Sequence, residues 1–182
     1  LLILLQKWTS GRQNVLMVIP AHLRTQWREL LDEKISVPSM FVDTNSIWDE
    51  ALKNGEINPF EQEAIVVTTY DFAVEKAEFL SQIKWDATMF DEAGCLRKAH
   101  SEEAKEALTL KSAVGDAFKI LLTATPMQLN IMDLFGLIYF IDATVFPDEK
   151  VYYDRYFRKP ENYPELAARV NHYCFRTLRS QV

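Results

Sequence analysis

Two adjacent carboxylates, Asp91 and Glu92, follow the apolar run 87–90. A buried strand that ends in two acids is costly unless a charged partner lies beside them, because a desolvated carboxylate needs compensation. A nucleotide-bound Mg²⁺ would be such a partner: Asp91 would hold the metal through its water shell, and Glu92 would polarise the attacking water. A solvated turn explains most such pairs when they are taken alone. The pair therefore indicates a candidate phosphoryl-transfer site and no more.

A second polar strand end occurs further along the chain. The apolar run 118–122 ends in Thr123, Ala124 and Thr125, and Pro126 then stops strand pairing. Short hydroxyl side chains at a strand end can relay hydrogen bonds between a phosphate site and a neighbouring surface. A threonine-rich strand end without a function is the alternative. The two strand ends in one chain are much less common than either alone.

The elements that position these residues alternate along the chain. Runs that are apolar throughout predict buried strands, and each is followed by a helical pattern, which is typical of an α/β fold with a parallel sheet covered by helices on both faces. Ligands of such sheets bind at the carboxyl ends of the strands, where both polar segments fall. The predicted strands are 14–19, 40–42, 64–68, 87–90 and 118–122, and the predicted helices are 22–34, 46–53, 72–82, 101–114 and 131–141.

Two helix starts carry side-chain signals. Asp71 is placed to cap the predicted helix 72–82. Glu102 and Glu103 are placed in the first turn of the predicted helix 101–114, where acids are favourable. Both signals therefore predict where these helices begin.

An Asp-Glu-Ala strand end followed by a Thr-Ala-Thr-Pro strand end resembles the second and third motifs of superfamily-two helicases, and four further blocks favour the Swi/Snf branch. They resemble that family's motif Ia, its Thr-Thr-Tyr segment, the block after motif III and the segment that leaves the first lobe. Such blocks in the family's order, over nearly the whole chain, are hard to obtain by chance. In this chain they are VLMVIPAHLRTQWREL (15–30), VVTTYD (66–71), TPMQLNIMDLFGLIYFI (125–141) and FRTLRSQV (175–182).

The resemblance implies a RecA-like (P-loop NTPase) first motor lobe over residues 1–146, with a helical extension over 147–182 that leads towards a second lobe. It implies ATP and Mg²⁺ as cofactors, with Asp91 and Glu92 as catalytic residues and Asp91 as the metal ligand through water. It also implies that a set of strand-end and loop residues couples hydrolysis with movement. These are Gly94, Thr123, Ala124, Thr125 and Gln128.

The implied partner is double-stranded DNA, bound without sequence preference, with a DNA-bound protein that is remodelled as a further candidate. Short hydroxyls, backbone N–H groups and helix N-termini bind phosphates without reading bases, which suits such a partner. No membrane is implied, and the expected compartment is the bacterial cytoplasm, at the nucleoid, or the nucleus of a eukaryote. The implied DNA contacts are Pro20, Ala21, His22, Arg24, Thr68, Thr69, Tyr70, Arg176 and Arg179.

The chain departs from the family pattern at two positions. Motif II usually reads Asp-Glu-Ala-His and then Arg-x-Lys-Asn, but here Gly94 replaces the histidine and the sequence continues Cys95-Leu96-Arg97-Lys98. The imidazole that usually links the hydrolysis site to motif III is therefore missing, and the link is either lost or rebuilt with Arg97 or the Gln128 block. Leu129 replaces the usual Asn after Gln128.

The phosphate-binding loop G-x-x-x-x-G-K-[ST] does not occur in these 182 residues. Residues 1–9 resemble the family's helix that follows that loop, so the resemblance places the loop immediately before them. It places the second lobe, with its arginine finger, after residue 182. We therefore expect an N-terminally truncated fragment of a longer DNA translocase, which does not hydrolyse ATP by itself.

Charge and composition narrow the classes of protein that fit this sequence. The net charge of −6 argues against a general nucleic-acid-coating protein but leaves room for a local phosphate-binding face. Cys95 and Cys174 give no metal spacing, and we interpret His22, His100 and His172 as structural or surface residues apart from the motif Ia turn that includes His22. Two alternatives stay open: a catalytically inactive interaction module, and an RNA-directed helicase of the same superfamily.

Overall fold

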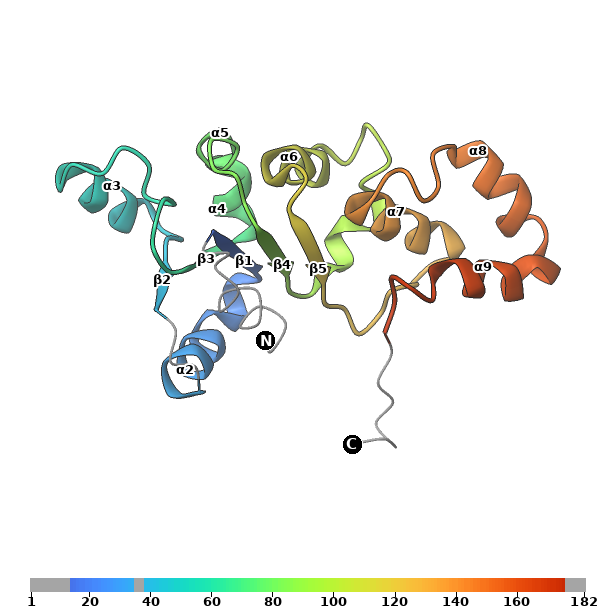
Figure 1. The fold of residues 1–182 in the computed structure, drawn as a ribbon, viewed down its shortest axis with the longest axis horizontal. Coiled ribbons are helices and arrows are strands. Elements are labelled where there is room, and N and C mark those ends of the chain that lie inside the picture. The colour runs from blue at the N-terminus through green and yellow to red at the C-terminus, as the bar shows by residue number, and fades with distance from the viewer. Residues whose placement is uncertain (1–13, 35–37, 176–182) are drawn as a thin grey trace.

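A parallel five-stranded sheet forms the centre of the molecule (Figure 1). The computed structural model describes residues 14–34 and 38–175. The strand order among the described residues is β2-β3-β1-β4-β5, so β1 lies in the middle of the sheet and the later strands extend it on both sides. The strands are β1 (Val15–Ile19), β2 (Ser39–Phe41), β3 (Ile65–Thr69), β4 (Ala87–Phe90) and β5 (Phe118–Leu121).

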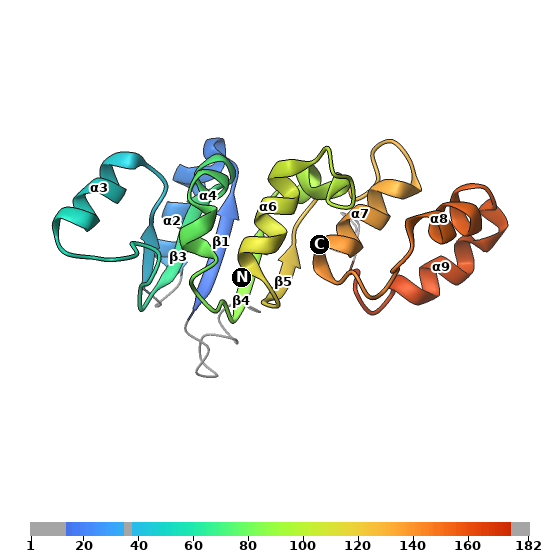
Figure 2. The ribbon, with the colours of Figure 1, turned by 90° about the horizontal axis from the view of Figure 1, so that it is seen from above.

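Helices cover both faces of this sheet, as the apolar strands predict. In Figure 1, α2 (Arg24–Lys34) lies below the strands, whereas α4 (Tyr70–Glu75), α5 (Ala77–Leu80) and α6 (Lys105–Val114) lie above them. Figure 2, turned by 90°, shows α4 and α6 lying over the sheet and running roughly along the strands. Two further helices, α3 (Asn45–Lys53) and α7 (Ile131–Ile141), flank the two edges of the sheet. The prediction of the fold class is confirmed.

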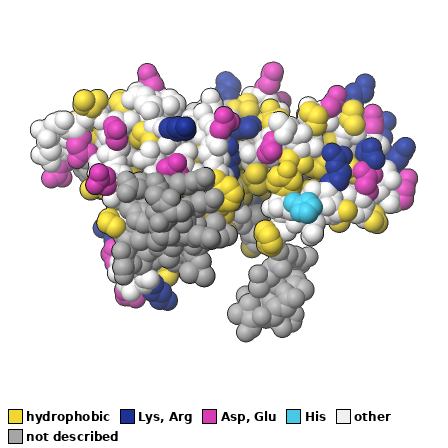
Figure 3. Space-filling view, viewed as in Figure 1, with side chains coloured by type: hydrophobic (Ala, Val, Ile, Leu, Met, Phe, Trp, Pro, Cys, Tyr) yellow, Lys and Arg dark blue, Asp and Glu magenta, His cyan; other side chains and the backbone are white. Residues whose placement is uncertain are grey.

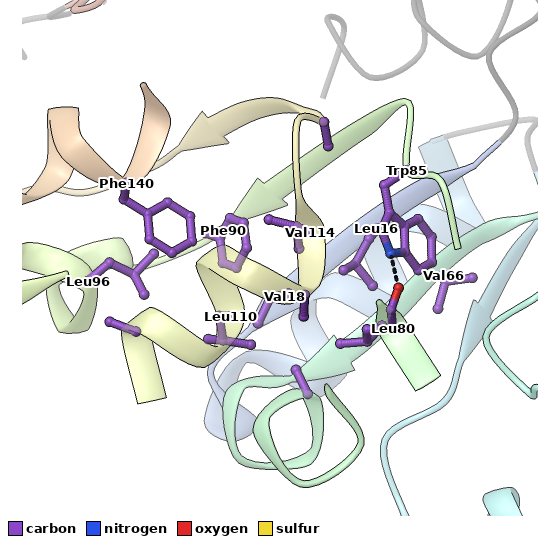
Figure 4. Close-up of a cluster of buried hydrophobic side chains, with 14 of the residues drawn as sticks. Leu16, Val18, Val66, Leu80, Trp85, Phe90, Leu96, Leu110, Val114 and Phe140 are labelled. Carbon is purple, nitrogen blue, oxygen red and sulfur yellow. Dashed lines mark hydrogen bonds between the residues drawn. The ribbon is translucent and has the colours of Figure 1, made fainter. Parts of the chain in front are cut away.

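Alternating side chains of β1 divide the core into two layers. Val15, Met17 and Ile19 pack with Leu31 of α2 on one face. Leu16 and Val18 point into the larger cluster on the other face, which Figure 4 shows with aromatic residues from several elements. In that cluster the rings of Phe90 and Phe140 meet edge to face, with their centroids 5.0 Å apart, and the Trp85 indole donates a 2.9 Å hydrogen bond to the Leu80 carbonyl.

A separate aromatic cluster joins the last part of the chain to α7. Phe135 of α7 packs with Phe146, Tyr152 and Tyr156, and Arg155 of the same region pairs with Glu165 at 2.8 Å. Because this cluster shares α7 with the sheet domain, a boundary at residue 146 stays a prediction. The elements of this region are α8 (Glu149–Tyr152), the π-helical turn η3 (Tyr153–Phe157), η4 (Pro160–Asn162) and α9 (Tyr163–Val170).

Hydrophobic side chains line a groove between α7 and α9, visible as a yellow area in Figure 3. Met127, Ile131 and Leu134 form one side of the groove, and Leu166 and Val170 form the other. Within residues 14–34 and 38–175, none of the helices is long and apolar enough to cross a membrane.

The two helix-start predictions are wrong. Asp71 is the second residue of α4, which begins at Tyr70, and the helix predicted over 72–82 is interrupted at Lys76 before α5 resumes. The helix predicted from residue 101 begins only at Lys105, because Ser101–Ala104 closes a turn in which the Ala104 amide donates to the Ser101 carbonyl at 3.0 Å. Glu102 and Glu103 therefore precede the helix. The helix expected over 1–9 lies outside the described residues.

Candidate nucleotide and DNA site

Asp91 lies at the carboxyl end of β4, and its side chain is held from two directions. The Trp27 indole of α2 donates to its Oδ2 at 2.7 Å, and the Glu92 amide donates to its Oδ1 at 3.0 Å. The backbone is fixed as well: the Asp91 amide donates to the Val18 carbonyl at 2.9 Å, and the Tyr70 hydroxyl donates to the Asp91 carbonyl at 2.8 Å. Trp27 belongs to the block that resembles motif Ia, but nothing in the sequence marks its contact with Asp91.

Glu92 adopts the left-handed backbone conformation, with φ 48° and ψ 46°. It is the sole non-glycine residue with positive φ in the described part of the chain, and this conformation is costly for an ordinary side chain. The turn is fixed by the Ala93 amide, which donates to the Leu122 carbonyl at 2.8 Å. The turn directs the Glu92 carboxylate outwards, where 58% of the side chain is exposed.

The predicted catalytic acid meets a residue of the predicted DNA-binding turn. The Nε2 atom of His22 lies 3.7 Å from Oε2 of Glu92, and both side chains are mostly exposed. An exposed pair of this kind contributes little to stability. The contact shows instead that motif Ia, with His22, and motif II, with Glu92, lie side by side at this edge of the sheet.

Three of the predicted coupling residues converge on one side chain, Arg97. Its guanidinium donates to the carbonyl of Gly94, to Thr125 and to the side chain of Gln128. The Thr123 hydroxyl accepts a 3.1 Å hydrogen bond from the Thr125 amide. The small side chain of Ala124 is exposed. The expected link between the two strand ends is therefore present and is built with Arg97.

Asp133 in the first turn of α7 holds the loop after β5. Its Oδ2 accepts hydrogen bonds from the amides of Gln128 and Leu129, both at 2.7 Å. Burial alone would raise the pKa of Asp133, but these amides, that of Asn130 and the nearby Arg97 charge hold the pKa below its usual value. Asp133 thus remains ionised and anchors the Gln128 block to the start of the helix.

The predicted DNA-binding turn at Pro20 is exposed, but its arginine is paired. Ala21 and His22 lie in the short 3-10 helix η1 (Ala21–Leu23), whose preceding residue is Pro20. The Nε of Arg24 lies 2.6 Å from Oδ2 of Asp43, a residue whose side chain is buried. Burial raises the pKa of Asp43, while the neighbouring arginine charges oppose that shift. Much of the Arg24 charge is therefore already compensated within the domain.

Thr68 and Thr69 are predicted DNA contacts, but their side chains are buried in this structure. Both belong to β3, which lies inside the sheet between β1 and β2, and Thr68 is completely buried. Tyr70 is half-buried with its hydroxyl on the Asp91 carbonyl, and burial raises its pKa further above the usual range. Tyr70 therefore connects α4 to the acidic pair. Arg176 and Arg179 lie outside the described residues.

The acidic pair suits an ion that brings most of its own ligands. In the described ranges, no group of three or more His, Cys, Asp or Glu side chains could hold a metal. Mg²⁺ is commonly bound through one or two carboxylates, with waters and nucleotide phosphates completing its shell. Asp91 and Glu92 at the open edge of the sheet fit that donor set.

The fold is that of a RecA-like ATPase core: a parallel sheet covered by helices, here with an acidic pair and a Thr-Ala-Thr segment at its carboxyl edge. The model of the SNF2-related domain family matches residues 2–182, so the chain belongs to that family. RNA polymerase-associated protein RapA of Proteus mirabilis is 30% identical over 93% of this chain, which corresponds to 17% of RapA. Chromatin-remodeling ATPase INO80 of Kluyveromyces lactis is 29% identical over 72% of this chain, which corresponds to 8% of INO80.

A solved structure confirms the architecture. The SWI2/SNF2 ATPase core of Sulfolobus solfataricus, in complex with double-stranded DNA, aligns with 96% of this chain at a TM-score of 0.73 and 18% identity. The alignment covers 36% of that core. The RecA-like ATPase-core fold is thus established, and the chain spans a small part of the proteins that it resembles.

Proposed function

We propose that the protein containing this chain hydrolyses ATP under stimulation by duplex DNA and moves along that DNA. Residues 1–146 would be part of its first motor lobe, and residues 147–182 would lead towards the second. The observation that carries this proposal is the acidic pair at the carboxyl edge of an SNF2-family sheet, with Asp91 held by Trp27 and Glu92 turned outwards. The relatives that are ATPases and the neighbour solved with DNA support it.

Each side chain of the site has a role in this reaction. Mg-ATP, when bound, supplies the metal charge and the phosphoryl group that passes to water. Asp91 would hold the metal through water, with the Trp27 indole restricting rotation of its carboxylate. Glu92 would orient and polarise the attacking water. The segment 123–128 would transmit the state of this site to the neighbouring surface of the lobe.

We expect the 182-residue chain alone to bind Mg-ATP weakly and to hydrolyse none. It contains no G-x-x-x-x-G-K-[ST] loop, which normally supplies most phosphate contacts. Titration calorimetry with Mg-ATP measures this directly. A low-micromolar dissociation constant would mean that other residues of this chain bind the phosphates.

We expect the DNA contact of this lobe to be weak, independent of sequence and sensitive to salt. Each neutralised phosphate contributes about −0.9 to the slope of log affinity against log salt, so an acidic lobe with few donors gives a slope of about −2 to −3. In the full-length protein, Arg24→Ala should reduce the slope by at most about one unit on every duplex, because Asp43 already compensates part of the Arg24 charge. The matched control is Arg158→Ala, which removes an exposed charge paired with Asp154 in the extension.

The buried Asp43 makes a second variant necessary for this test, because Arg24→Ala also leaves that carboxylate without its partner. Arg24→Ala combined with Asp43→Asn removes both charges and should show the same reduction in slope. Titrations of two unrelated duplexes at several salt concentrations compare the variants. An unchanged slope in both Arg24 variants, or a strong preference for one duplex, would place the DNA path elsewhere.

Movement along DNA is tested by displacement of a third strand from a triplex. The full-length protein should displace the strand in an ATP-dependent reaction that requires duplex flanking the triplex. ATP hydrolysis without displacement would contradict translocation. Stimulation by RNA in place of duplex DNA would favour an RNA-directed helicase, and the absence of any hydrolysis would favour an inactive interaction module.

A further inference from the structure

The Arg97 guanidinium joins the ends of two neighbouring strands. Its Nη1 donates to the Gly94 carbonyl at 3.1 Å and to Oε1 of Gln128 at 3.0 Å. Its Nε donates to the Thr125 carbonyl at 3.1 Å, and its Nη2 donates to the Thr125 hydroxyl at 2.7 Å and to the same carbonyl. A planar guanidinium can serve several acceptors at once, which a lysine ammonium at the same place cannot do with fixed geometry.

Gly94 provides the space for this guanidinium. A Cβ atom at Gly94 would lie 2.9 Å from both Nη atoms of Arg97 and 3.0 Å from its Cζ. The glycines with positive φ in the described residues are Gly55 and Gly115, so Gly94 is not needed for its backbone angles. The glycine at residue 94 thus leaves the space that the guanidinium of Arg97 fills.

The partners of Arg97 are neutral. Within the described ranges its guanidinium forms no ion pair, and its acceptors are two carbonyls, a hydroxyl and an amide. Hydrogen bonds from a charged donor are stronger than those between neutral groups. Arg97 is half-buried, and all of these hydrogen bonds go to the two strand ends. They therefore stabilise the arrangement in which the two ends lie together.

The same contact reaches the water-orienting acid through one residue. The Gly94 amide donates to the Glu92 carbonyl at 2.6 Å, and the Gly94 carbonyl accepts from Arg97. Glu92 itself needs external support, because its left-handed conformation is unfavourable for a non-glycine residue. Gly94 therefore connects the Arg97 guanidinium to the Glu92 turn by hydrogen bonds from both its amide and its carbonyl.

We propose that Arg97, seated against Gly94, is the positioning residue that couples the Glu92 turn to the segment 123–128 and so sets the catalytic rate of the DNA-stimulated ATPase. The proposal rests on the function proposed above and assigns this role to a pair, Gly94 with Arg97, rather than to an imidazole. Gly94→Ala and Gly94→His should be harmful while Arg97 is present, because either side chain displaces the guanidinium.

The test measures DNA-stimulated ATP hydrolysis by the full-length protein, with kcat normalised to nucleotide-binding sites. Arg97→Ala should lower kcat by about tenfold or more, as expected for the loss of several hydrogen bonds from a charged donor, while KM for ATP changes by less than about threefold. Arg97→Lys should fall between Arg97→Ala and wild type. Lys98→Ala, which removes an exposed cation next in the chain, should stay within about twofold of wild type.

A double-mutant cycle tests the pairing. Gly94→Ala should lower kcat when Arg97 is present, but adding Gly94→Ala to Arg97→Ala should cause no further loss, because the displaced group is then absent. Retention of wild-type kcat by Arg97→Ala, or additive losses in the double variant, would overturn the proposal. A wild-type protein without DNA-stimulated hydrolysis would instead refute the proposed function, and the coupling role would be refuted with it.

Discussion

Glu92→Gln in the full-length protein should reduce ATP turnover by at least about 10²-fold while nucleotide affinity changes little, because general-base assistance contributes roughly 10²–10⁴-fold. The substitution keeps the size of the side chain and removes the charge that would polarise the attacking water. The exposed position of the Glu92 carboxylate means that its loss leaves no buried partner unpaired. Steady-state hydrolysis and equilibrium binding of a fluorescent ATP analogue measure the two effects separately.

Asp91→Asn serves as the comparison for Glu92→Gln. Asp91 would hold the metal, so this variant should lose turnover and should also require more Mg²⁺ for its residual activity. Both oxygens of Asp91 accept hydrogen bonds from neighbours, so the amide also changes the local contacts. If Glu92→Gln retained more than about a tenth of the wild-type rate, the role proposed for Glu92 would be wrong.

Gly136→Ala should destabilise this domain by about 3 kcal/mol, at the upper end of what extra atoms in a packed interior usually cost. Gly136 lies in α7 against the short helix η2 (Ala93–Lys98), and an added Cβ would lie 1.6 Å from the Arg97 carbonyl oxygen. Alanine is the better helix former by about 1 kcal/mol, which offsets only part of this cost. The urea midpoint of the domain within the full-length protein, followed by tryptophan fluorescence, measures the change.

Gly115→Ala is a matched control with a different cause. A Cβ at Gly115 would meet nothing within 4 Å, but this residue has φ 52° and ψ −132°, a conformation that costs a non-glycine residue about 1–3 kcal/mol. The control should therefore lower the urea midpoint through backbone strain alone, without a steric contribution. Equal stability of Gly136→Ala and wild type would show that α7 can move away from η2 without cost. In that case the close contact of the helix with the motif II turn would not be essential to the fold.

The regular core of the fold could be predicted because its signals are local. Residues 15–19 and 64–67 are apolar at every position, which is typical of a strand inside a covered parallel sheet. The start of α6 could not be predicted from Glu102 and Glu103, because a turn competes with the helix there: the Ser101 carbonyl accepts from the Ala104 amide and the Ser101 hydroxyl accepts from the Glu103 amide. The break between α4 and α5 at Lys76 likewise has no glycine or proline to mark it.

The sequence predicted which carboxylates lie at the candidate site, but it did not predict the hydrogen bonds that hold them. Adjacent carboxylates after a strand mark Asp91 and Glu92 in the sequence, but the indole of Trp27 reaches Asp91 from a different element. The same holds for Arg97 and Thr125, which are brought together by the pairing of β4 with β5. Burial is also not marked in the motif: the resemblance implies a DNA contact at Thr68, whereas its side chain is buried in the sheet.

The most direct test of the proposed function is the rate of ATP hydrolysis by the full-length protein, measured without nucleic acid, with duplex DNA and with duplex RNA. We predict that duplex DNA of any sequence raises kcat several-fold, that RNA does not, and that Glu92→Gln abolishes the stimulated rate. A rate that is unaffected by duplex DNA, or that rises equally with RNA, would contradict the proposal that this lobe belongs to a DNA-dependent motor.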